Sequence, residues 1–121
     1  MQDILTCAMG LDVHRDVIVA CLAKGELGAD PEIEIRSFST LIPEMRKLRD
    51  WVLEVDCHHV AMESTGIYWQ PIYEMLEPCF DGQINILVVN ARHMKNVPGR
   101  KTDMRDAQWI ATLVRAGLLK V

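Results

Sequence analysis

The first third of the chain holds three short runs of apolar or alternating residues, separated by polar turns. Cys7–Val13 and Val17–Ala23 lie only a few polar residues apart, and the second is rich in β-branched side chains, so the two predict a hairpin. Residues 24–31 contain two glycines, an aspartate and a proline, which predict a turn. Glu32–Arg36 then alternates polar and apolar side chains, as a half-exposed strand at a sheet edge does.

A helix is predicted after this strand. Thr40 is a residue type that caps helices, and Pro43 is tolerated in a first turn. The apolar positions that follow recur at helical spacing and predict one buried stripe, formed by Leu41, Met45, Leu48, Val52 and Val55.

The next segments predict a strand, a helix and another strand. His59–Met62 is short, apolar and ends at Glu63. Residues 64–66, Ser-Thr-Gly, are typical of a turn and helix cap, with Ser64 as the cap of a helix that runs through Tyr73 to Leu76. Ile84–Val89 is an unbroken apolar run, which indicates a strand buried on both faces.

A basic connection leads from residue 92 to residue 100, and a last helix is expected over about residues 103–118. One side of that helix is apolar and carries Ala107, Ile110, Val114 and Leu118.

The element order is therefore β-β-β-α-β-α-β-α, which predicts an α/β fold. Three consecutive strands form a meander, and the later helices supply crossovers to parallel strands, giving a mixed five-stranded sheet flanked by helices. The ribonuclease H group and the actin-like ATPase group share this order. The 121 residues suffice for one domain with one core.

Charge is distributed unevenly along the chain. Residues 1–91 carry six Lys/Arg and fifteen Asp/Glu, for a net charge of −9, whereas residues 92–121 carry seven Lys/Arg and two Asp, for +5. The asymmetry indicates either a basic binding edge or a solvated basic helix. With no secretory signal and no apolar run long enough for a bilayer, we expect a cytoplasmic protein.

The four cysteines are widely spaced and lie mostly in apolar segments, so we expect buried free thiols. No C-x-x-C pair supports a structural zinc site. A partial metal site at Cys57-His58-His59 is disfavoured because neighbouring side chains on a strand point to opposite faces.

Two acids fall at the ends of predicted strands. Asp12 ends the first strand and Glu63 ends the fourth. If these strands are parallel neighbours about 4.8 Å apart, both acids emerge at the carboxyl edge of the sheet, where ligands bind in open α/β sheets.

A second pair, Asp103 and Asp106, lies three residues apart at the start of the last helix and so shares one helix face. From Asp106 this face continues to Ile110 and Val114, toward the interior of the domain. Hard oxygen ligands without Cys or His favour Mg²⁺ or Mn²⁺, and two such ions clamp a phosphodiester.

Each acid also has a structural alternative. Asp103 could be an N-cap and Asp106 could interact with the helix dipole, while Glu63 could accept backbone hydrogen bonds and Asp12 could serve a turn. Asp16 is a rival ligand, although its position at the start of the second strand favours a turn role.

Three stretches resemble one protein family. They are Gly10-Leu11-Asp12-Val13-His14, then Met62-Glu63-Ser64-Thr65-Gly66 with Tyr68-Trp69, and Pro98-Gly99-Arg100-Lys101-Thr102-Asp103-Met104-Arg105-Asp106-Ala107. In this order and spacing they resemble bacterial insertion-sequence transposases with a DEDD, RuvC-like N-terminal domain, and the related pilin-gene-inverting recombinases.

The resemblance implies a ribonuclease-H-like (RuvC-like) fold in which Asp12, Glu63, Asp103 and Asp106 are the catalytic, metal-binding acids. It also implies Mg²⁺-dependent DNA cleavage and strand exchange at insertion-element ends and target, with Mn²⁺ as a substitute ion. A structured guide RNA, a homo-oligomer and a C-terminal domain with a nucleophilic serine are implied for the full-length protein. On this basis residues 1–121 are expected to be one catalytic domain, an N-terminal fragment without that second domain.

Further residues are candidates for binding nucleic acid. Tyr68 and Trp69 either stack on unpaired bases or pack into the core. The basic residues around the last acid pair are expected to hold phosphates, or else to neutralise the acids: Arg92, Lys95, Arg100, Lys101 and Arg105.

Two other functions remain open from the sequence. An actin-like ATPase or sugar kinase fragment would need a glycine- and threonine-rich phosphate hairpin after Asp12, which residues 13–15 do not provide. A non-catalytic nucleic-acid-binding assembly module would keep the basic edge without needing the four acids.

Overall fold

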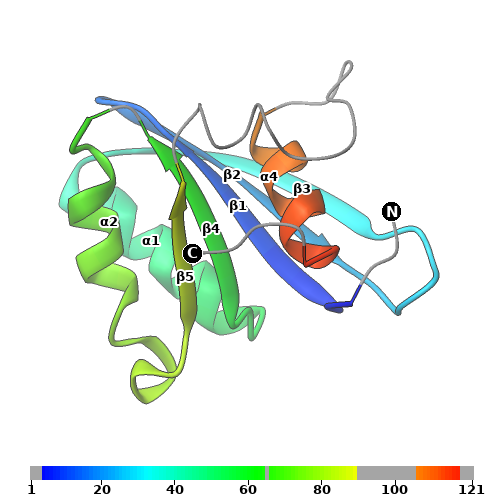
Figure 1. Ribbon diagram of the computed structural model, residues 1–121. Coiled ribbons are helices and arrows are strands. Elements are labelled where there is room, and N and C mark those ends of the chain that lie inside the picture. Colours follow the sequence, from blue (N-terminus) through cyan, green and yellow to red (C-terminus); the bar gives the residue numbers. More distant parts are fainter. Residues whose placement is uncertain (1–3, 65, 90–105, 118–121) are drawn as a thin grey trace.

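The computed structural model describes residues 4–64, 66–89 and 106–117 and confirms the predicted mixed α/β architecture (Figure 1). Five strands form one sheet in the order β3-β2-β1-β4-β5. The elements in chain order are β1 (Cys7–Val13), β2 (Val17–Lys24), β3 (Glu32–Ser39), α1 (Ile42–Glu54), β4 (His59–Ser64), α2 (Trp69–Leu76), the 3₁₀ turn η1 (Cys79–Gly82), β5 (Asn85–Val89) and α4 (Asp106–Arg115).

The sheet is antiparallel in its first half and parallel in its second. β1, β2 and β3 form the expected meander, in which β2 pairs with both of the others. The chain then crosses through α1 to β4, which pairs with β1 in parallel, and through α2 to β5, which pairs with β4 in parallel. β3 lies at one edge and is mostly exposed, as its alternating sequence predicts.

Helices cover both faces of the sheet, as Figure 1 shows. On one face, α1 and α2 bury the larger side chains of β1, among them Met9 and Leu11, together with Val60 and Met62 of β4. On the other face, α4 packs on small residues, including Ala8 and Ala61. The size difference lets α4 approach the sheet closely.

The buried guanidinium of Arg115 fixes the last turn of α4. This side chain is 1% exposed, and it donates hydrogen bonds to the backbone oxygens of Leu5 (2.9 Å), Gly25 (3.0 Å) and Glu26 (3.2 Å). The contacts join α4 to the segment before β1 and to the β2–β3 turn.

Both predicted helix caps are wrong. No side chain caps α1, whose N-cap position is Leu41, and the Thr40 hydroxyl instead donates to the backbone oxygen of Arg15 at 2.8 Å. Ser64 is the last residue of β4, and α2 begins after Tyr68, again without a side-chain cap. Thr40 makes a contact with a residue distant in the sequence, and Ser64 belongs to a strand that is longer than the local pattern predicts.

Two burial predictions also need correction. Leu41 precedes α1 and is exposed, while Trp51, outside the predicted stripe, is buried with Met45, Leu48 and Val52. β5 is not buried on both faces: among the described strands it is at the edge of the sheet, paired with β4, and Val89 is the only buried residue of the strand.

The cysteine prediction holds. All four thiols are free, and Cys21, Cys57 and Cys79 are buried while Cys7 is partly buried. Within the described ranges, no helix is long and apolar enough to cross a membrane.

Candidate functional site

Asp12 and Glu63 lie side by side at the carboxyl edge of the sheet. They are register partners in the parallel pairing of β1 with β4, so their α-carbons are about 4.8 Å apart. Side chains alternate along a strand, and Ala8 and Ala61 face α4. Asp12 and Glu63 are therefore on the α4 face as well, and they emerge at the same carboxyl edge, as the ends of their two apolar runs predict.

On this face of the sheet, the start of α4 lies toward the Asp12 and Glu63 carboxylates. A Cβ atom on Gly10 would lie 2.6 Å from the Ala111 nitrogen and 2.9 Å from the Ile110 Cβ, so only a glycine fits beneath the helix. The other end of α4 is bound to Leu5, before β1. α4 thus runs antiparallel to β1, and its N-terminal residue, Asp106, points toward the edge that carries Asp12.

Buried positions beyond Asp106 agree with this placement. Ile110 and Val114, one and two turns further along α4, are buried against Ala8 and Ala61. The predicted inward face of the last helix is therefore confirmed. The positive end of the α4 dipole also lies at this edge, where it favours carboxylates or phosphates.

Asp12 has a partner that the sequence analysis did not single out. His14 Nε2 lies 3.1 Å from Asp12 Oδ2, and the Asp12 side chain is 17% exposed. The two residues are two positions apart at the end of β1, so they project to the same side. This i, i+2 spacing of a carboxylate and an imidazole is the signal that could have identified the pair.

Asp12 and Glu63 do not by themselves make a metal site among the described residues. No group of three or more His, Cys, Asp or Glu side chains in these ranges is arranged to hold a metal ion. Asp103 lies outside the described residues, as do the basic candidates Arg92, Lys95, Arg100, Lys101 and Arg105.

The donor set nevertheless fits Mg²⁺ in its chemistry. Mg²⁺ prefers hard oxygen ligands and is commonly held by one or two protein carboxylates, with waters and substrate phosphates completing its coordination. Asp12 and Glu63 are two such carboxylates in register, and Asp106 approaches from α4. The rival Asp16 belongs to the β1–β2 turn, where it is 75% exposed and paired with Arg15.

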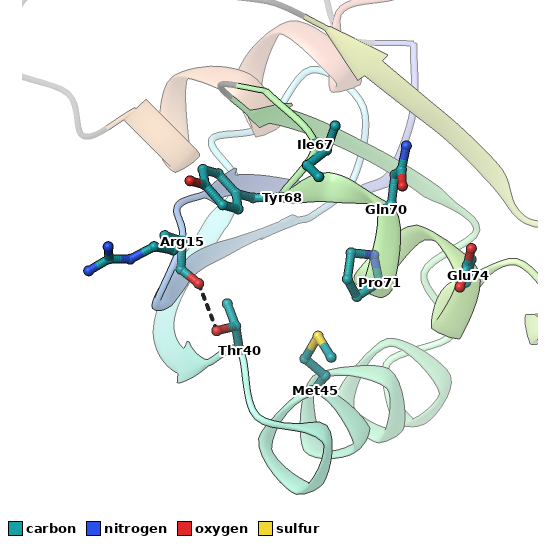
Figure 2. A pocket seen from close by; sticks show the side chains of 8 residues that line it. All are labelled: Arg15, Thr40, Met45, Ile67, Tyr68, Gln70, Pro71 and Glu74. Atoms are coloured by element: carbon teal, nitrogen blue, oxygen red, sulfur yellow. Dashed lines mark hydrogen bonds between the residues drawn. The ribbon is translucent and has the colours of Figure 1, made fainter.

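A cavity of about 320 Å³ opens beside this edge, on the side covered by α1 and α2 (Figure 2). Met45 and Pro71 form its apolar base, and Tyr68 and Ile67 border its opening. The remaining lining residues are polar: Arg15, Thr40, Gln70 and Glu74.

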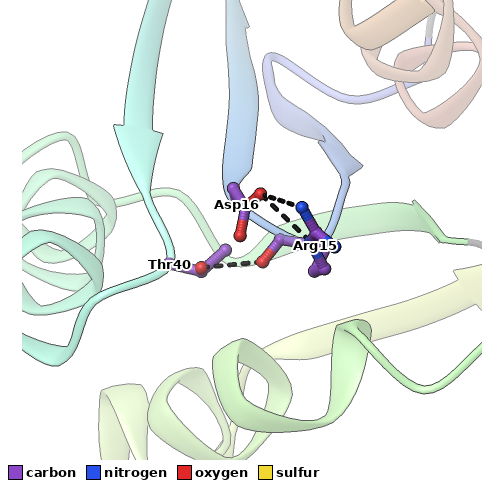
Figure 3. A network of polar contacts seen from close by, with 3 residues as sticks. All are labelled: Arg15, Asp16 and Thr40. Atoms are coloured by element: carbon purple, nitrogen blue, oxygen red, sulfur yellow. Dashed lines mark hydrogen bonds and ion pairs between the residues drawn. The ribbon is translucent and has the colours of Figure 1, made fainter.

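Two polar contacts lie at the wall of this cavity nearest to β1 (Figure 3). The Thr40 hydroxyl donates to the Arg15 backbone oxygen at 2.8 Å and so joins the β1–β2 turn to the segment before α1. The Arg15 guanidinium donates from Nη2 to Asp16 at 2.9 Å and from Nε at 3.1 Å. The hydrogen bond to Asp16 is the main cause of a raised pKa of Arg15.

The two aromatic candidates divide between surface and core. Tyr68 is exposed, whereas Trp69 packs against the main core and meets Tyr73 edge to face with ring centroids 5.6 Å apart. Of the two alternatives given by the sequence, Trp69 therefore follows core packing.

The fold and the carboxylate edge define a ribonuclease-H-like, RuvC-like domain, and solved structures share this fold. Thermus thermophilus RuvC in complex with Holliday junction is 14% identical over 88% of this chain and 91% of that one, with a TM-score of 0.58, and RuvC alone is 8% identical over 90% of each chain, with a TM-score of 0.57. Fowlpox virus resolvase, solved with Holliday junction DNA, is 11% identical over 78% of this chain and 65% of that one, with a TM-score of 0.55.

A sequence comparison identifies the family to which this chain belongs within that fold. The IS110-type DEDD family, described as transposase, matches residues 9–121. The chain therefore belongs to this transposase family, as the three sequence stretches suggest. No curated protein matches the sequence.

Proposed function

We propose that this chain is the metal-dependent DNA-cleaving domain of an IS110-type transposase. Asp12, Glu63, Asp103 and Asp106 are its metal-binding acids, and Mg²⁺ is the working ion, with Mn²⁺ as a substitute. The observation that carries the proposal is the register pairing of Asp12 with Glu63 at the sheet edge toward which α4 starts.

The roles of the residues follow from their positions. Asp12 and Glu63 project from rigid neighbouring strands, so the distance between them is fixed before any ligand binds. Gly10 allows α4 to bring Asp106 to the same edge. His14 lies beside one oxygen of Asp12 and would orient this carboxylate for an ion.

Bound divalent ions would supply Lewis-acid stabilisation of a phosphodiester and activation of its attacking nucleophile. The protein positions the DNA strand for that chemistry. The basic residues 92–105 would hold the flanking phosphates, which is the electrostatic role that we assign to Arg92, Lys95, Arg100, Lys101 and Arg105.

The family membership supports the wider setting of the proposal. We infer that the domain acts on DNA at insertion-element ends and target, directed by a structured guide RNA. Strand exchange further requires a homo-oligomer and a second domain in cis that supplies a nucleophilic serine. Residues 1–121 are one catalytic domain in this scheme.

Metal-dependent thermal stabilisation tests the carboxylate site directly. We expect millimolar Mn²⁺ or Mg²⁺ to raise the melting temperature of the chain, because an ion that binds only the folded state stabilises it. The Asp12→Asn, Asp106→Asn double variant should lose this response. Asp16→Asn is the matched control, since Asp16 is a neighbouring acid that the structure places in the turn.

The control separates a specific site from general screening of acidic charge. An equal metal response in the parent and in the double variant would refute the proposed ligands. A parent that does not respond either alone or with single-stranded DNA present, to supply phosphates, would refute the metal site as a whole.

A further inference from the structure

We propose that the cavity lined by Tyr68, Met45 and Pro71 is a subsite for one unstacked nucleobase of the DNA strand held at the carboxylates. The inference rests on the proposed function for the identity of the strand. It adds a contact to the base of a neighbouring nucleotide, which the carboxylates and phosphate-binding residues do not provide.

The position of the cavity is the first argument. Arg15 follows Asp12 by three residues, which limits the separation of their α-carbons to about 11 Å. Ile67 and Tyr68 follow Glu63 by four and five residues. Both chain segments that leave the carboxylates therefore border the cavity. Asp12 and Glu63 lie on the α4 face of the sheet and the cavity on the face of α1 and α2, so a strand bound at the carboxylates would reach the cavity by crossing the carboxyl edge of the sheet.

The shape and chemistry of the cavity are the second argument. The cavity has a volume of about 320 Å³ and is open at the surface, where Ile67 is 68% exposed and Tyr68 42% exposed. Exposed aromatic rings bind unpaired bases by stacking. Beneath them the Met45 sulfur points into the cavity beside Pro71, which gives a flat ligand an apolar surface on its second side (Figure 2).

Polar groups on the rim fit the edge of a base. Gln70 offers a donor and an acceptor, and Glu74 offers an acceptor. The Thr40 hydroxyl donates to Arg15 and keeps lone pairs that can accept a hydrogen bond. A wholly apolar protein side chain would leave these groups without partners, whereas a base has matching donors and acceptors around its edge.

Arg15 supplies a positive charge for the phosphate of the nucleotide. Its guanidinium points away from the cavity, and its partner Asp16 is a neighbour in an equally exposed turn (Figures 2 and 3). Exposed ion pairs of this kind hold little free energy. The guanidinium can therefore turn to the phosphate of a nucleotide whose base occupies the cavity.

The test uses single-stranded DNA with 2-aminopurine, whose fluorescence is quenched by stacking, and metal-free buffer with chelator. We expect Tyr68→Ala to weaken binding about ten-fold and to remove the quenching, since one stacked base contributes on this scale. Tyr68→Phe keeps the ring and should bind within about two-fold of the parent. Arg15→Ala should weaken binding and reduce the slope of log K against log salt by about one.

A control with a similar ion pair exists further along α1. Arg49 donates to Asp50 from Nε at 3.2 Å and from Nη2 at 3.0 Å, the same local arrangement as Arg15 with Asp16, and it lines a different cavity. Arg49→Ala should leave both binding and salt slope unchanged. Equal effects of the two arginine substitutions would show a diffuse charge effect and overturn the role of Arg15.

Two further measurements complete the test. DNA with an abasic site in place of 2-aminopurine should bind the parent and Tyr68→Ala equally, and an equal loss with both DNAs would overturn the base contact. RNA of the same sequence should bind more weakly than DNA, and tighter RNA binding would assign the subsite to RNA instead. Unchanged DNA binding by a folded Tyr68→Ala variant would refute the inference, as would a parent that binds no DNA.

These outcomes are separable from the fate of the proposed function. The binding assay contains no metal, whereas the carboxylate test reads metal-dependent melting without requiring Tyr68. If the parent shows Tyr68-dependent quenching but no metal response, the base subsite stands and the proposed metal-dependent nuclease function is refuted. If the parent shows a metal response but no Tyr68-dependent quenching, only the base subsite is refuted.

Discussion

Gly10 of β1 lies directly beneath Ala107 of α4, in a contact that no larger residue allows. An added Cβ would meet the Ala107 oxygen, and it would also stand 2.6 Å from the Ala111 nitrogen and 2.9 Å from the Ile110 Cβ. Because two of these atoms are backbone, the helix as a whole must shift to relieve the overlap.

The first prediction concerns this contact. Gly10→Ala should lower the free energy of unfolding by about 1–3 kcal/mol, the usual cost of overpacking. It should also weaken the Mn²⁺ response, because Asp106 moves with α4. Chemical denaturation and metal-dependent melting measure the two effects.

Gly28→Ala is the comparison for this variant. Gly28 has a φ of 85° and open space around it, so an alanine there is strained without touching α4. It should lose about 1 kcal/mol of stability and keep the full metal response. A Gly10→Ala protein with unchanged stability would contradict the close approach.

The importance of Gly10 shows where sequence patterns stop being informative. The ends of the apolar runs place Asp12 and Glu63 correctly because strand ends are local features. The partner of Gly10 lies about a hundred residues away, and nothing near Gly10 indicates it. Close approach of a helix to a sheet is a property of two distant segments together.

Thr40 and β3 show the same limit. Local pattern makes Thr40 a cap, but its hydroxyl bonds to a turn 25 residues earlier. β3 continues to Ser39 instead of ending at Arg36, because β2 offers partners for those residues, with Val17 opposite Ser39. Strand length is set by the neighbouring strand as well as by the residues of the strand itself.

The second prediction concerns Arg115. Replacing this buried guanidinium by methionine keeps much of its volume and removes the donors to three backbone oxygens. Arg115→Met should therefore lower the free energy of unfolding by about 3 kcal/mol, because three part-buried backbone acceptors lose the donors of a buried side chain.

Arg46→Met is its control, because Arg46 is exposed on α1. It should change stability by less than about 0.5 kcal/mol. Both values come from urea titrations followed by circular dichroism. Equal effects of the two substitutions would show that the Arg115 contacts do not hold the end of α4.

The third prediction concerns thiol reactivity. A hydrogen bond with Cys57, helped by the charge of Lys24, lowers the pKa of Cys7 to about 7 against the opposing effect of burial. The same hydrogen bond and burial raise the pKa of Cys57. Since the thiolate is the nucleophile, alkylation of Cys7 should rise with pH around a midpoint near 7, and Cys57 should stay unmodified.

Mass spectrometry after brief iodoacetamide treatment at a series of pH values reads this midpoint. Cys57→Ala removes the hydrogen-bond donor and should move the midpoint for Cys7 upward. Cys79→Ala, at a buried thiol elsewhere in the core, should not move it. A midpoint near 9 for Cys7 in the parent would disprove the interaction with Cys57.

The last prediction is a reversal in the effect of Asp12→Asn between metal-free and metal-loaded protein. Two carboxylates about 5 Å apart repel each other by about 3 kcal/mol at an effective dielectric constant of 20. The contact of His14 with Asp12 offsets about 1 kcal/mol of this. In chelator and low salt, Asp12→Asn should therefore be more stable than the parent by about 1–2 kcal/mol. With Mn²⁺ at a hundred times its dissociation constant the parent gains about 2.7 kcal/mol and becomes the more stable protein.

Asp16→Asn should show no such reversal, because Asp16 is exposed in the turn. Melting curves with chelator and with Mn²⁺ decide the matter, and a variant that is less stable than the parent in chelator would mean that Asp12 serves the fold rather than a ligand.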